Sequence, residues 1–434
     1  MDRKMNIFWH RRDLRIEDNA GLFKALKGGG PVQPLFIFDK NILNELPKDD
    51  QRVLFIYQQI KALKEAYKKL GADLWVFYDK PENVYKTLVK EYSLEKVFSN
   101  RDYEPYAKDR DKTIYEILNQ NGVEFVGAKD HVIFEKDEVL KDDGNPYKVF
   151  TPYMRKWKAK LNGFFLSSYP VEKYRDNFRK SDQKKLITLG EMGFNNEQIQ
   201  DFPSKEFPKS IVENYHETRD YPAQRGTSRL SLHLRFGTIS IRELTRFAIK
   251  HNEKYLNELV WRDFYQMIIH HFPKSVNTAF KPEYDKLKWR NNTEEFELWC
   301  KGKTGYPLVD AGMRELNETG FMHNRVRMVV ASFLTKHLLI DWRWGEAYFA
   351  EKLLDFELAS NVGGWQWAAS SGVDAQPYFR VFNPTSQFDK FDKEEKYVKR
   401  WVREYGTSKY PEPIVDHKFA RERVLAAFKA LKEN

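Results

Sequence analysis

The sequence has a single cysteine, Cys300, in 434 residues. One thiol excludes an internal disulfide framework and any cysteine-rich metal site, and we interpret it as a small buried apolar residue. The chain also lacks any run of about 18 apolar residues, and its first residues carry no apolar signal core. We therefore expect a cytoplasmic protein that does not enter a membrane.

Several patterns that would carry chemistry are missing as well. The ten histidines are scattered, and no Ser-His-Asp order, paired-carboxylate pattern or ligand set with zinc spacing stands out. The glycine run 28–30 lacks the spacing of a dinucleotide-binding loop and does not open a helix after a strand, so we interpret it as a turn. The sequence predicts no metal site and favours a protein that holds an organic cofactor.

What the chain does have is positive charge and aromatic rings. The net charge is +10, and 15% of the residues are aromatic, including 11 tryptophans and 23 tyrosines. A surplus of Lys and Arg raises the affinity for a polyanion through counterion release, and aromatic side chains stack on flat rings. Both features suit nucleic-acid binding, although large helical cores also use many aromatic residues.

The length predicts two domains, of which the first spans residues 1–130. Short β-rich runs alternate there with helical patterns at 51–70 and 106–121, and Gly71 and Gly122 stand at the expected helix ends. The expected strands span 5–10, 32–38, 74–78, 96–99 and 124–126. This alternation predicts an α/β domain with a doubly wound parallel sheet.

Two further regions follow. Residues 131–206 lose periodicity and contain scattered prolines, which is typical of a long connector. Residues 207–434 predict an all-α domain. Apolar residues recur there at helical spacing over 238–251, 256–271, 307–318, 325–339, 344–354 and 419–431.

One segment of the helical region, residues 355–372, combines polar side chains with two indoles. Asp355, Glu357 and Asn361 precede a Gly-Gly pair, which Trp365 and Trp367 follow. Small residues let the backbone approach a large flat group, so the segment suits a planar, partly polar heterocycle. A loop with two buried tryptophans explains the same residues equally well.

Hydroxyl side chains gather at the start of an expected helix. Thr227, Ser228 and Ser231, together with Arg229, could hold a phosphate where free backbone N–H groups and the helix dipole favour an anion. Plain N-capping is the simpler alternative, but it needs only one of these hydroxyls.

Another expected helix places Glu258, Trp261, Arg262 and Tyr265 on one face. In a cavity, Glu258 could exchange a hydrogen bond with a base edge while Trp261 offers a stacking surface. Without further context, a Glu at the surface edge beside a buried Trp is the simpler interpretation.

A third expected helix carries Asn324 and Met328 on related faces, and an Asn side chain can pair with a base or amide edge. Arg325 and Arg327 alternate along it. One of them is therefore expected to face solvent or nucleic acid, while the other meets a buried carboxylate such as Asp355.

Six motifs occur in order along the chain, and together they are specific. They are Trp-His-Arg-Arg-Asp-Leu-Arg-Ile-Glu-Asp-Asn at 9–19, Gly-Thr-Ser-Arg-Leu-Ser at 226–231, Glu-Leu-Val-Trp-Arg-Asp-Phe-Tyr at 258–265, Thr-Gly-Tyr-Pro-Leu-Val-Asp at 304–310, Met-His-Asn-Arg-Val-Arg-Met at 322–328 and Asn-Val-Gly-Gly-Trp-Gln-Trp-Ala-Ala at 361–369. In these motifs the sequence resembles the DNA photolyase and cryptochrome family over essentially its whole length. The closest resemblance is to the class I cyclobutane pyrimidine dimer photolyases of bacteria.

This resemblance implies a flavoprotein lyase that binds FAD in its helical domain and repairs UV-damaged DNA. In the family, the lesion is flipped out of the duplex, and blue light drives electron transfer to it from reduced flavin. The residues implied to hold FAD are Tyr215, Thr227, Ser228, Arg229, Leu230, Ser231, Tyr255, Arg262, Arg327, Asp355, Phe356, Glu357 and Asn361, with an Arg327–Asp355 pair among them. Those implied to act on the lesion are Glu258, Asn324, Met328, Trp261, Trp367 and Asn361.

The resemblance also implies a DNA-binding surface and an electron path. The implied DNA contacts are Arg219, Glu258, Trp261, Tyr265, Asn324, Arg325, Arg380, Asn383, Gln387 and Lys390. Trp365, Trp342 and Trp289 match the family's relay of three tryptophans, which reduces oxidised flavin from the surface. We expect a monomer with no obligate protein partner.

Two other kinds of family member are alternatives. A (6-4) photolyase relies on active-site histidines, where this sequence offers Asn324, Met328 and Trp367. A cryptochrome, which senses blue light without repair, commonly carries a C-terminal extension, and the sequence ends at Asn434 without one. We therefore expect a cyclobutane dimer photolyase.

The sequence departs from the family pattern at three positions. Glu357 stands where the best-known members have Asp, and Tyr255 stands where some carry Trp, so both substitutions could change how the flavin is tuned. Ala107 occupies the position of a Glu in members with a folate antenna, which argues against a folate antenna of that type. The presence and identity of a second, antenna chromophore stay open.

Overall fold

The computed structural model describes residues 4–198 and 201–433. The chain forms two compact units, each built from three stretches. The first unit comprises Met1–Glu135, Leu161–Phe207 and Arg229–Phe247, and the second comprises Lys136–Lys160, Pro208–Ser228 and Ala248–Asn434. The expected connector, residues 131–206, thus contributes to both units.

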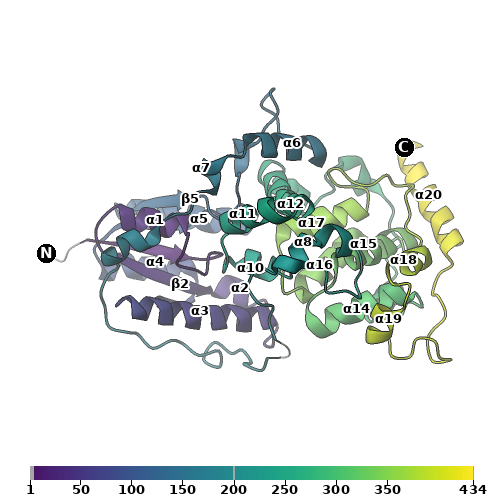
Figure 1. Cartoon of the computed structure of the whole chain (residues 1–434), viewed down its shortest axis with the longest axis horizontal. Coiled ribbons are helices and arrows are strands. Elements are labelled where there is room, and N and C mark those ends of the chain that lie inside the picture. The colour runs from purple at the N-terminus through teal and green to yellow at the C-terminus, as the bar shows by residue number, and fades with distance from the viewer. Residues whose placement is uncertain (1–3, 199–200, 434) are drawn as a thin grey trace. The chain divides into compact units, whose positions relative to one another are not determined.

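The first unit is built on five parallel strands (Figure 1). In chain order they are β1 Met5–His10, β2 Val32–Asp39, β3 Trp75–Asp79, β4 Leu94–Asn100 and β5 Glu124–Ala128. Their order in the sheet is β3-β2-β1-β4-β5, with the first strand at the centre, as in doubly wound folds. The predicted fold class and all five predicted strands are confirmed.

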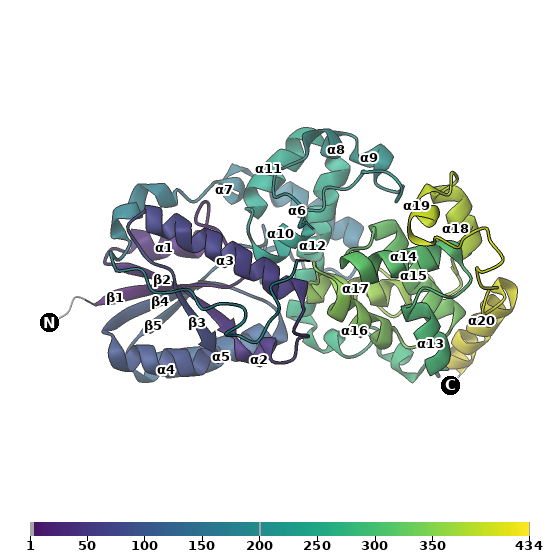
Figure 2. The same cartoon turned by 90° about the horizontal axis from the view of Figure 1, so that it is seen from below.

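Helices cover both faces of this sheet (Figure 2). Phe8 and Phe36 point toward helices α1 Ala20–Lys27 and α3 Gln51–Lys69, and they share a core with residues of both. Ile7 and Leu35, one residue earlier on each strand, share a second core with α4 Pro81–Glu91 and α5 Pro105–Gln120. Because successive strand residues alternate between faces, strands with apolar residues at nearly every position are covered on both sides.

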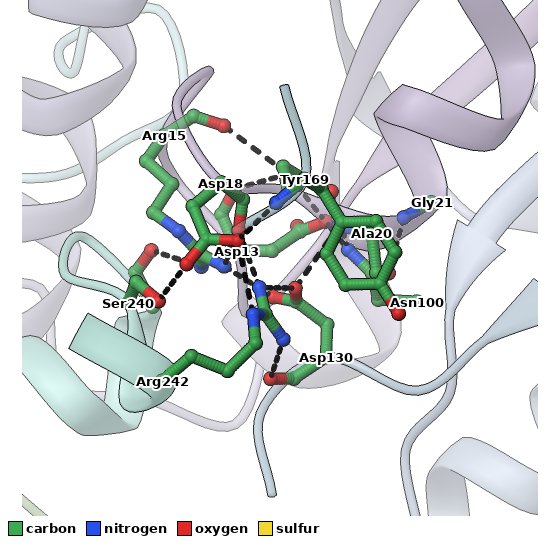
Figure 3. Close-up of polar contacts among 12 residues, drawn as sticks. Asp13, Arg15, Asp18, Ala20, Gly21, Asn100, Asp130, Tyr169, Ser240 and Arg242 are labelled. Atoms are coloured by element: carbon green, nitrogen blue, oxygen red, sulfur yellow. Dashed lines mark hydrogen bonds and ion pairs between the residues drawn. The ribbon is translucent and has the colours of Figure 1, made fainter. Parts of the chain in front are cut away.

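The first sequence motif supplies a buried charge network within this unit (Figure 3). Arg242 donates to Asp18 at 2.9 Å and to Asp130 at 2.8 Å, and Arg15 donates to Asp130 at 2.7 Å. Burial by itself would raise the pKa of Asp130, but the two guanidinium groups hold it well below its ordinary value. These charged residues therefore have a structural use.

The second unit is helical, as predicted. Its main helices are α12 Glu253–His271, α14 Pro307–Thr319, α15 Asn324–Ser332, the π-helical η5 Phe333–His337, α16 Trp342–Lys352, α17 Leu358–Ala368 and α20 His417–Glu433. Helices α14 to α17 and η5 share a core that includes Trp299, Phe333, Trp342 and Trp365, all buried, whereas α20 packs in a smaller cluster through Val424 and Phe428.

Shorter elements complete both units. They are α2 Lys40–Leu43, η1 Lys136–Glu138, α6 Phe150–Lys160, α7 Gly163–Leu166, η2 Val171–Asn177, α8 Lys209–Glu213, α9 Tyr215–Thr218, α10 Ser231–Phe236, α11 Ile241–His251, η3 Pro273–Val276, η4 Pro282–Lys286, α13 Thr293–Cys300, α18 Pro384–Phe391 and α19 Lys396–Trp401. Helix α6 lies in the segment that we expected to be an irregular connector. Among the residues that the structure describes, no helix has both the length and the apolar character to cross a membrane.

The segment with two indoles is a helix, so the alternative of a loop is wrong. Both glycines of the Gly-Gly pair lie inside α17. A Cβ atom on Gly363 would lie 2.3 Å from the ring of Tyr265, a contact that no side chain tolerates. Gly363 therefore lets α17 pack closely against α12, and this packing outweighs the poor helix propensity of glycine.

Candidate functional site: a polar cavity in the helical unit

The second unit contains a cavity of about 350 Å³, between α12, α15, α16 and α17. Most of the residues predicted to bind flavin or the lesion line it. The lining residues are Arg219, Glu258, Trp261, Tyr265, Asn324, Arg327, Met328, Ala331, Phe349, Leu353, Asp355, Phe356, Glu357, Ser360, Asn361, Gly364, Trp365 and Trp367. Side chains from widely separated motifs therefore meet at one place.

Helix α12 provides one wall. Asn252 caps it by accepting from the backbone N–H groups of Lys254 and Tyr255, which fixes where the helix starts. From that start, Glu258, Trp261 and Tyr265 fall on the face that lines the cavity.

Glu258 forms an ion pair with Arg219 at the cavity wall. Burial raises the pKa of Glu258 above its ordinary value, and the guanidinium of Arg219 opposes this rise. The protonated form of Glu258, which can donate a hydrogen bond, is consequently favoured compared with an exposed Glu.

Trp261 is held by an aromatic neighbour that the sequence did not point to. Its indole stacks on the ring of Phe150 with the centroids 3.6 Å apart and the planes 5° apart. Phe150 is the first residue of α6, in the segment where we predicted no regular structure. The stack leaves Trp261 as a rigid part of the wall.

Helix α15 provides another wall, and its start is as predicted. The His323 side chain accepts from the backbone N–H of Arg325 and caps the helix. Asn324, Arg327 and Met328 line the cavity, whereas Arg325 does not.

One of the two alternating arginines meets a carboxylate as predicted, whereas Arg325, which was the one left to face solvent or nucleic acid, also pairs with a carboxylate. Arg327 donates to both carboxylate oxygens of Asp355, at 3.0 and 3.1 Å. Arg325 donates to Asp220 at 2.7 Å and lies 4.4 Å from the ring centroid of Phe391. Each guanidinium is thereby fixed by a carboxylate.

Further polar contacts fix the segment that leads into α17. Arg262 donates to Glu357 at 3.0 Å, and Ser360 donates to the second oxygen of that carboxylate, also at 3.0 Å. Asn361 donates to the Glu346 carboxylate at 2.8 Å, and burial raises the pKa of that carboxyl group. Ser360 and Glu346 were not predicted, because an isolated Ser or Glu in a helical pattern gives no signal.

Trp365 and Trp367 lie on different sides of α17. Trp365 is 2% exposed, and a Cβ atom on Gly345 of α16 would lie only 2.1 Å from its ring. Trp367 is partly exposed and lines the cavity. Residues two apart on a helix diverge by about 200°, so Trp365 is buried in the core and Trp367 packs at its edge, while both indoles border the cavity.

The three relay candidates share one core. Trp342 begins α16, one helical turn before Gly345, on whose backbone the Trp365 ring packs. Trp289 is partly buried and packs against the same core. Trp299, which the sequence did not single out, also contacts Trp365, with ring centroids 6.1 Å apart.

The expected phosphate element has a more complex setting. Helix α10 begins at Ser231, and its N-cap residue, Leu230, forms no side-chain capping bond. Ser228 and Tyr255 share a hydrogen bond of 2.9 Å, and Tyr255 packs edge-on against Tyr215. The simpler alternative, in which one of these hydroxyls caps the helix, is therefore not observed at the N-cap residue of α10.

The remaining DNA-contact candidates lie at or near helix α18. Arg380 and Lys390 are exposed, and Gln387 is partly buried. The Asn383 side chain caps α18 by accepting from the backbone N–H groups of Thr385 and Ser386.

A larger cavity, of about 520 Å³, lies in the first unit. It is bounded by α3 and by residues 14–18, 205–207 and 238–243, and none of the predicted site residues lines it. By size alone, this cavity would be the candidate functional site. The smaller cavity is the better candidate, because arginine–carboxylate pairs and indoles converge on it.

The fold and the site together define a class. A parallel α/β unit is joined in one chain to a helical unit whose cavity is bordered by three arginine–carboxylate pairs and three indoles. This cavity is suited to a flat, polar organic cofactor.

Comparisons with known proteins identify the family. The family model described as DNA photolyase matches residues 6–173, and the model described as FAD-binding domain of DNA photolyase matches residues 255–407. A deoxyribodipyrimidine photo-lyase of Synechococcus sp. is 35% identical over 473 residues, covering 98% of this chain and 96% of that protein. The chain belongs to the DNA photolyase family, and its second unit carries the FAD-binding domain.

Solved structures agree in fold over the full length. A class III photolyase of Agrobacterium tumefaciens has a TM-score of 0.87 and 33% identity, with 100% of this chain and 99% of that chain covered. A Sulfolobus tokodaii photolyase with two FAD molecules has a TM-score of 0.80 and 34% identity, covering 98% and 100%. A Synechocystis sp. cryptochrome has a TM-score of 0.85 and 25% identity, covering 98% and 99%.

The residues at the cavity fit a flavin. The isoalloxazine ring is flat and has a polar edge, which the Arg327, Asp355 and Asn361 side chains could meet with hydrogen bonds. A Cβ atom on Gly364 would meet no described atom within 4 Å, so the backbone of α17 is open to a ring at that point. The donor set and the open glycine both suit this cofactor.

Proposed function

We propose that this chain is a light-driven enzyme that repairs cyclobutane pyrimidine dimers in DNA. The observation that carries the proposal is the convergence of flavin-binding candidates and lesion-binding candidates on one cavity of about 350 Å³. The name of the Synechococcus relative, deoxyribodipyrimidine photo-lyase, supports this substrate.

The cofactor would be held mainly by the residues around Asp355. The Arg327–Asp355 and Arg262–Glu357 pairs fix two carboxylates, and Asn361 is oriented by its hydrogen bond to Glu346. Thr227 and Ser228 would contact the phosphates. Reduced FAD bound here would, after absorbing light, supply the electron that opens the cyclobutane ring and would take it back afterwards.

The lesion would be gripped by the α12 and α15 walls. Protonated Glu258 would donate a hydrogen bond to a base carbonyl, and the Asn324 amide would pair with a base edge. Trp261 and Trp367 would bracket the flipped-out dimer, and Met328 would contact it. These apolar surfaces exclude water, which strengthens the polar contacts inside the cavity.

DNA binding would use the cationic side chains outside the cavity. Arg380 and Lys390 are exposed and can neutralise phosphates, and Asn383 and Gln387 stand near them. Arg219 and Arg325 are already paired with Glu258 and Asp220, so their net contribution to phosphate binding would be smaller.

The decisive experiment uses the reduced protein and a thymine-dimer oligonucleotide, with and without blue light. We expect loss of the dimer only in the light. If the dimer persists while the bound flavin still photoreduces, a cryptochrome role explains the protein better. Repair of a (6-4) lesion in place of the cyclobutane dimer would contradict the proposed substrate.

The electron path can be tested separately from repair. Trp365, Trp342 and Trp289 would carry electrons from the surface to oxidised flavin. We expect Trp342→Phe to abolish photoreduction of the oxidised protein, whereas repair by the chemically reduced protein continues.

The matched control for this path is Trp299→Phe, because Trp299 also contacts Trp365. Photoreduction should survive this change. If the Trp299 variant loses photoreduction and the Trp342 variant keeps it, the path runs through Trp299. If Trp342→Phe also abolishes repair, Trp342 has a structural role.

A further inference from the structure

Three potential metal ligands meet at the C-terminal end of α12. Asp137 lies in η1, and His270 and His271 are the last two residues of α12. One ligand atom from each lies within 4.8 Å of the others. Any three such atoms share a point no more than about 2.8 Å from each, so a shift of less than about 1 Å brings all three to zinc-ligand distance.

The two distances from His271 are a long hydrogen bond and an ion-pair contact, and both match the spacing of two ligands on one ion. The His271 Nε2 atom lies 3.4 Å from the Asp137 carboxylate and 3.3 Å from the Lys136 carbonyl oxygen. Both distances are longer than an ordinary N–H···O bond. Two ligands on one tetrahedral zinc ion, each at about 2.0–2.1 Å, stand about 3.4 Å apart.

The electrostatics of this place also favour a cation. The C-terminal end of a helix carries partial negative charge, and α12 is one of the two longest helices among the described residues. Two neutral imidazoles and one carboxylate are a ligand set that suits zinc and other late divalent metals. The side chain of Asp137 is 69% exposed, so an ion can enter from solvent.

We propose that Asp137, His270 and His271 form a binding site for Zn²⁺ or a similar divalent metal, completed by the Lys136 carbonyl or by water. The bound ion would fasten η1 to the end of α12. Because α12 carries Glu258, Trp261 and Tyr265 at its cavity face, the metal would stabilise this helix without touching the cavity. Asp137 is far in the sequence from the adjacent His270 and His271, which is why no zinc spacing was visible there.

Zinc titration calorimetry of the full chain, with flavin bound and any affinity tag removed, tests the proposal. We expect one equivalent of Zn²⁺ to bind. Asp137→Asn and His271→Gln should each weaken the affinity at least tenfold, and Co²⁺ should give the visible absorption of a low-symmetry His–carboxylate site. Retained flavin absorbance shows that each variant is folded. If His271→Gln does not fold, the Asp137→Asn variant alone tests the site, because Asp137 is exposed.

His216→Gln is the matched control. The His216 imidazole lies 3.5 Å from the Glu217 carboxylate, and among the described residues no third His, Cys, Asp or Glu joins that pair as a potential metal ligand. This variant should bind zinc like the unmodified protein. The proposal is overturned if the protein binds no zinc, or if the Asp137, His271 and His216 variants bind it equally well.

Discussion

Glu258 and Arg219 show how single residues set the chemistry of the cavity. Burial pushes the pKa of Glu258 upward, and the guanidinium beside it pulls the pKa down. The balance decides over which pH range Glu258 keeps the proton that it would donate to the lesion.

The first prediction concerns this balance. Arg219→Met removes the opposing charge, so the pKa of Glu258 should rise further. The falling, alkaline limb of the pH profile of repair should then move to higher pH, as measured with pre-reduced protein at saturating DNA. Arg380→Met is the control, since it also removes a cation from the expected DNA surface but lies outside the cavity lining. An unshifted profile in the Arg219 variant would mean that Glu258 does not act through its proton.

Two glycines of neighbouring helices give the second prediction. A Cβ atom on Gly345 would lie 2.1 Å from the Trp365 ring and 2.6 Å from Leu334, so Gly345→Ala should lower the free energy of unfolding by about 1–3 kcal/mol. Gly364→Ala should instead raise it by up to about 1 kcal/mol in the flavin-free protein, because alanine favours helices.

The two glycine variants should also differ in their affinity for FAD. Gly364→Ala fills the open place at the cavity and should weaken FAD affinity while the fold stays intact. Urea unfolding and flavin titration measure the two effects. Unchanged FAD affinity in the Gly364 variant would show that the ring lies elsewhere.

At the scale of elements, the π-helical η5 holds the C-terminal helix α20 through buried titratable groups. Lys336 donates to Ser370 at 2.6 Å and lies 4.6 Å from the ring centroid of Phe428 in α20. His337 shares a 2.8 Å hydrogen bond with His417 at the start of α20, and burial lowers the pKa of His337 to about 3. Below pH 6.5 His337 is protonated in the unfolded chain but stays neutral in the folded chain. The free energy of unfolding therefore falls as the pH is lowered from 6.5 toward 3.

The third prediction follows from Lys336. Burial lowers the pKa of Lys336 to about 7, whereas the unfolded chain keeps that proton up to about pH 10.5. Between these values the unfolded state binds more protons, so the cost of this lysine to stability is greatest below pH 7 and falls as the pH rises from 7 to 10.5. Lys336→Met should raise the free energy of unfolding by about 2–4 kcal/mol at pH 7, and the gain should shrink toward pH 10.

Urea unfolding at pH 7 and pH 9.5 measures this gain. The exposed Lys396 provides the control, because Lys396→Met should change the free energy of unfolding by less than about 0.5 kcal/mol at either pH. If Lys336→Met raises the free energy of unfolding equally at both pH values, the increase comes from packing and not from the buried charge.

Most elements could be predicted from periodicity, and the failures have physical reasons. The strands around Ile7 and Leu35 are short apolar runs bounded by turns, which is a strong local signal. Helix α17 gave no such signal because two glycines interrupt it; the contact with Tyr265 explains Gly363, whereas Gly364 faces open space. Helix α6 was not predicted because the segment around it is rich in prolines and charged residues. The role of Phe150 depends on its long-range stacking on Trp261, which local sequence does not indicate.

At the scale of the whole molecule, the net charge of +10 is expected to act on DNA affinity. The fourth prediction is that Arg380→Gln and Lys390→Gln each reduce the slope of log K against log salt by about 0.9, because each would remove one of the proposed phosphate contacts. Fluorescence anisotropy with undamaged duplex DNA at several salt concentrations measures this slope.

The control for the charge itself is Lys301→Gln. Lys301 is exposed and paired with Glu297, and it is not among the expected DNA contacts. Its loss changes the net charge by the same amount but should leave the slope unchanged. Equal changes in all three variants would mean that the overall charge, and no particular surface, sets DNA affinity.

The site was predictable only in parts. A face of α12 with Glu258 and Trp261, and a carboxylate partner for one of two arginines, follow from helical spacing. That these residues border one cavity with Asp355 and Trp367 depends on long-range packing, which spacing does not encode, and only the family resemblance indicated it. Glu346, Ser360 and Phe150 act on other side chains, so neither pattern nor motif exposed them.

The stack between Phe150 and Trp261 has a consequence for how tightly damaged DNA is bound. A free indole loses rotational freedom when a ligand orders it, and that loss weakens binding. With the ring centroids 3.6 Å apart, Trp261 is already immobilised when the chain folds. The entropy is therefore lost during folding, and the flipped-out dimer of the proposed reaction would meet a surface preorganised to receive it.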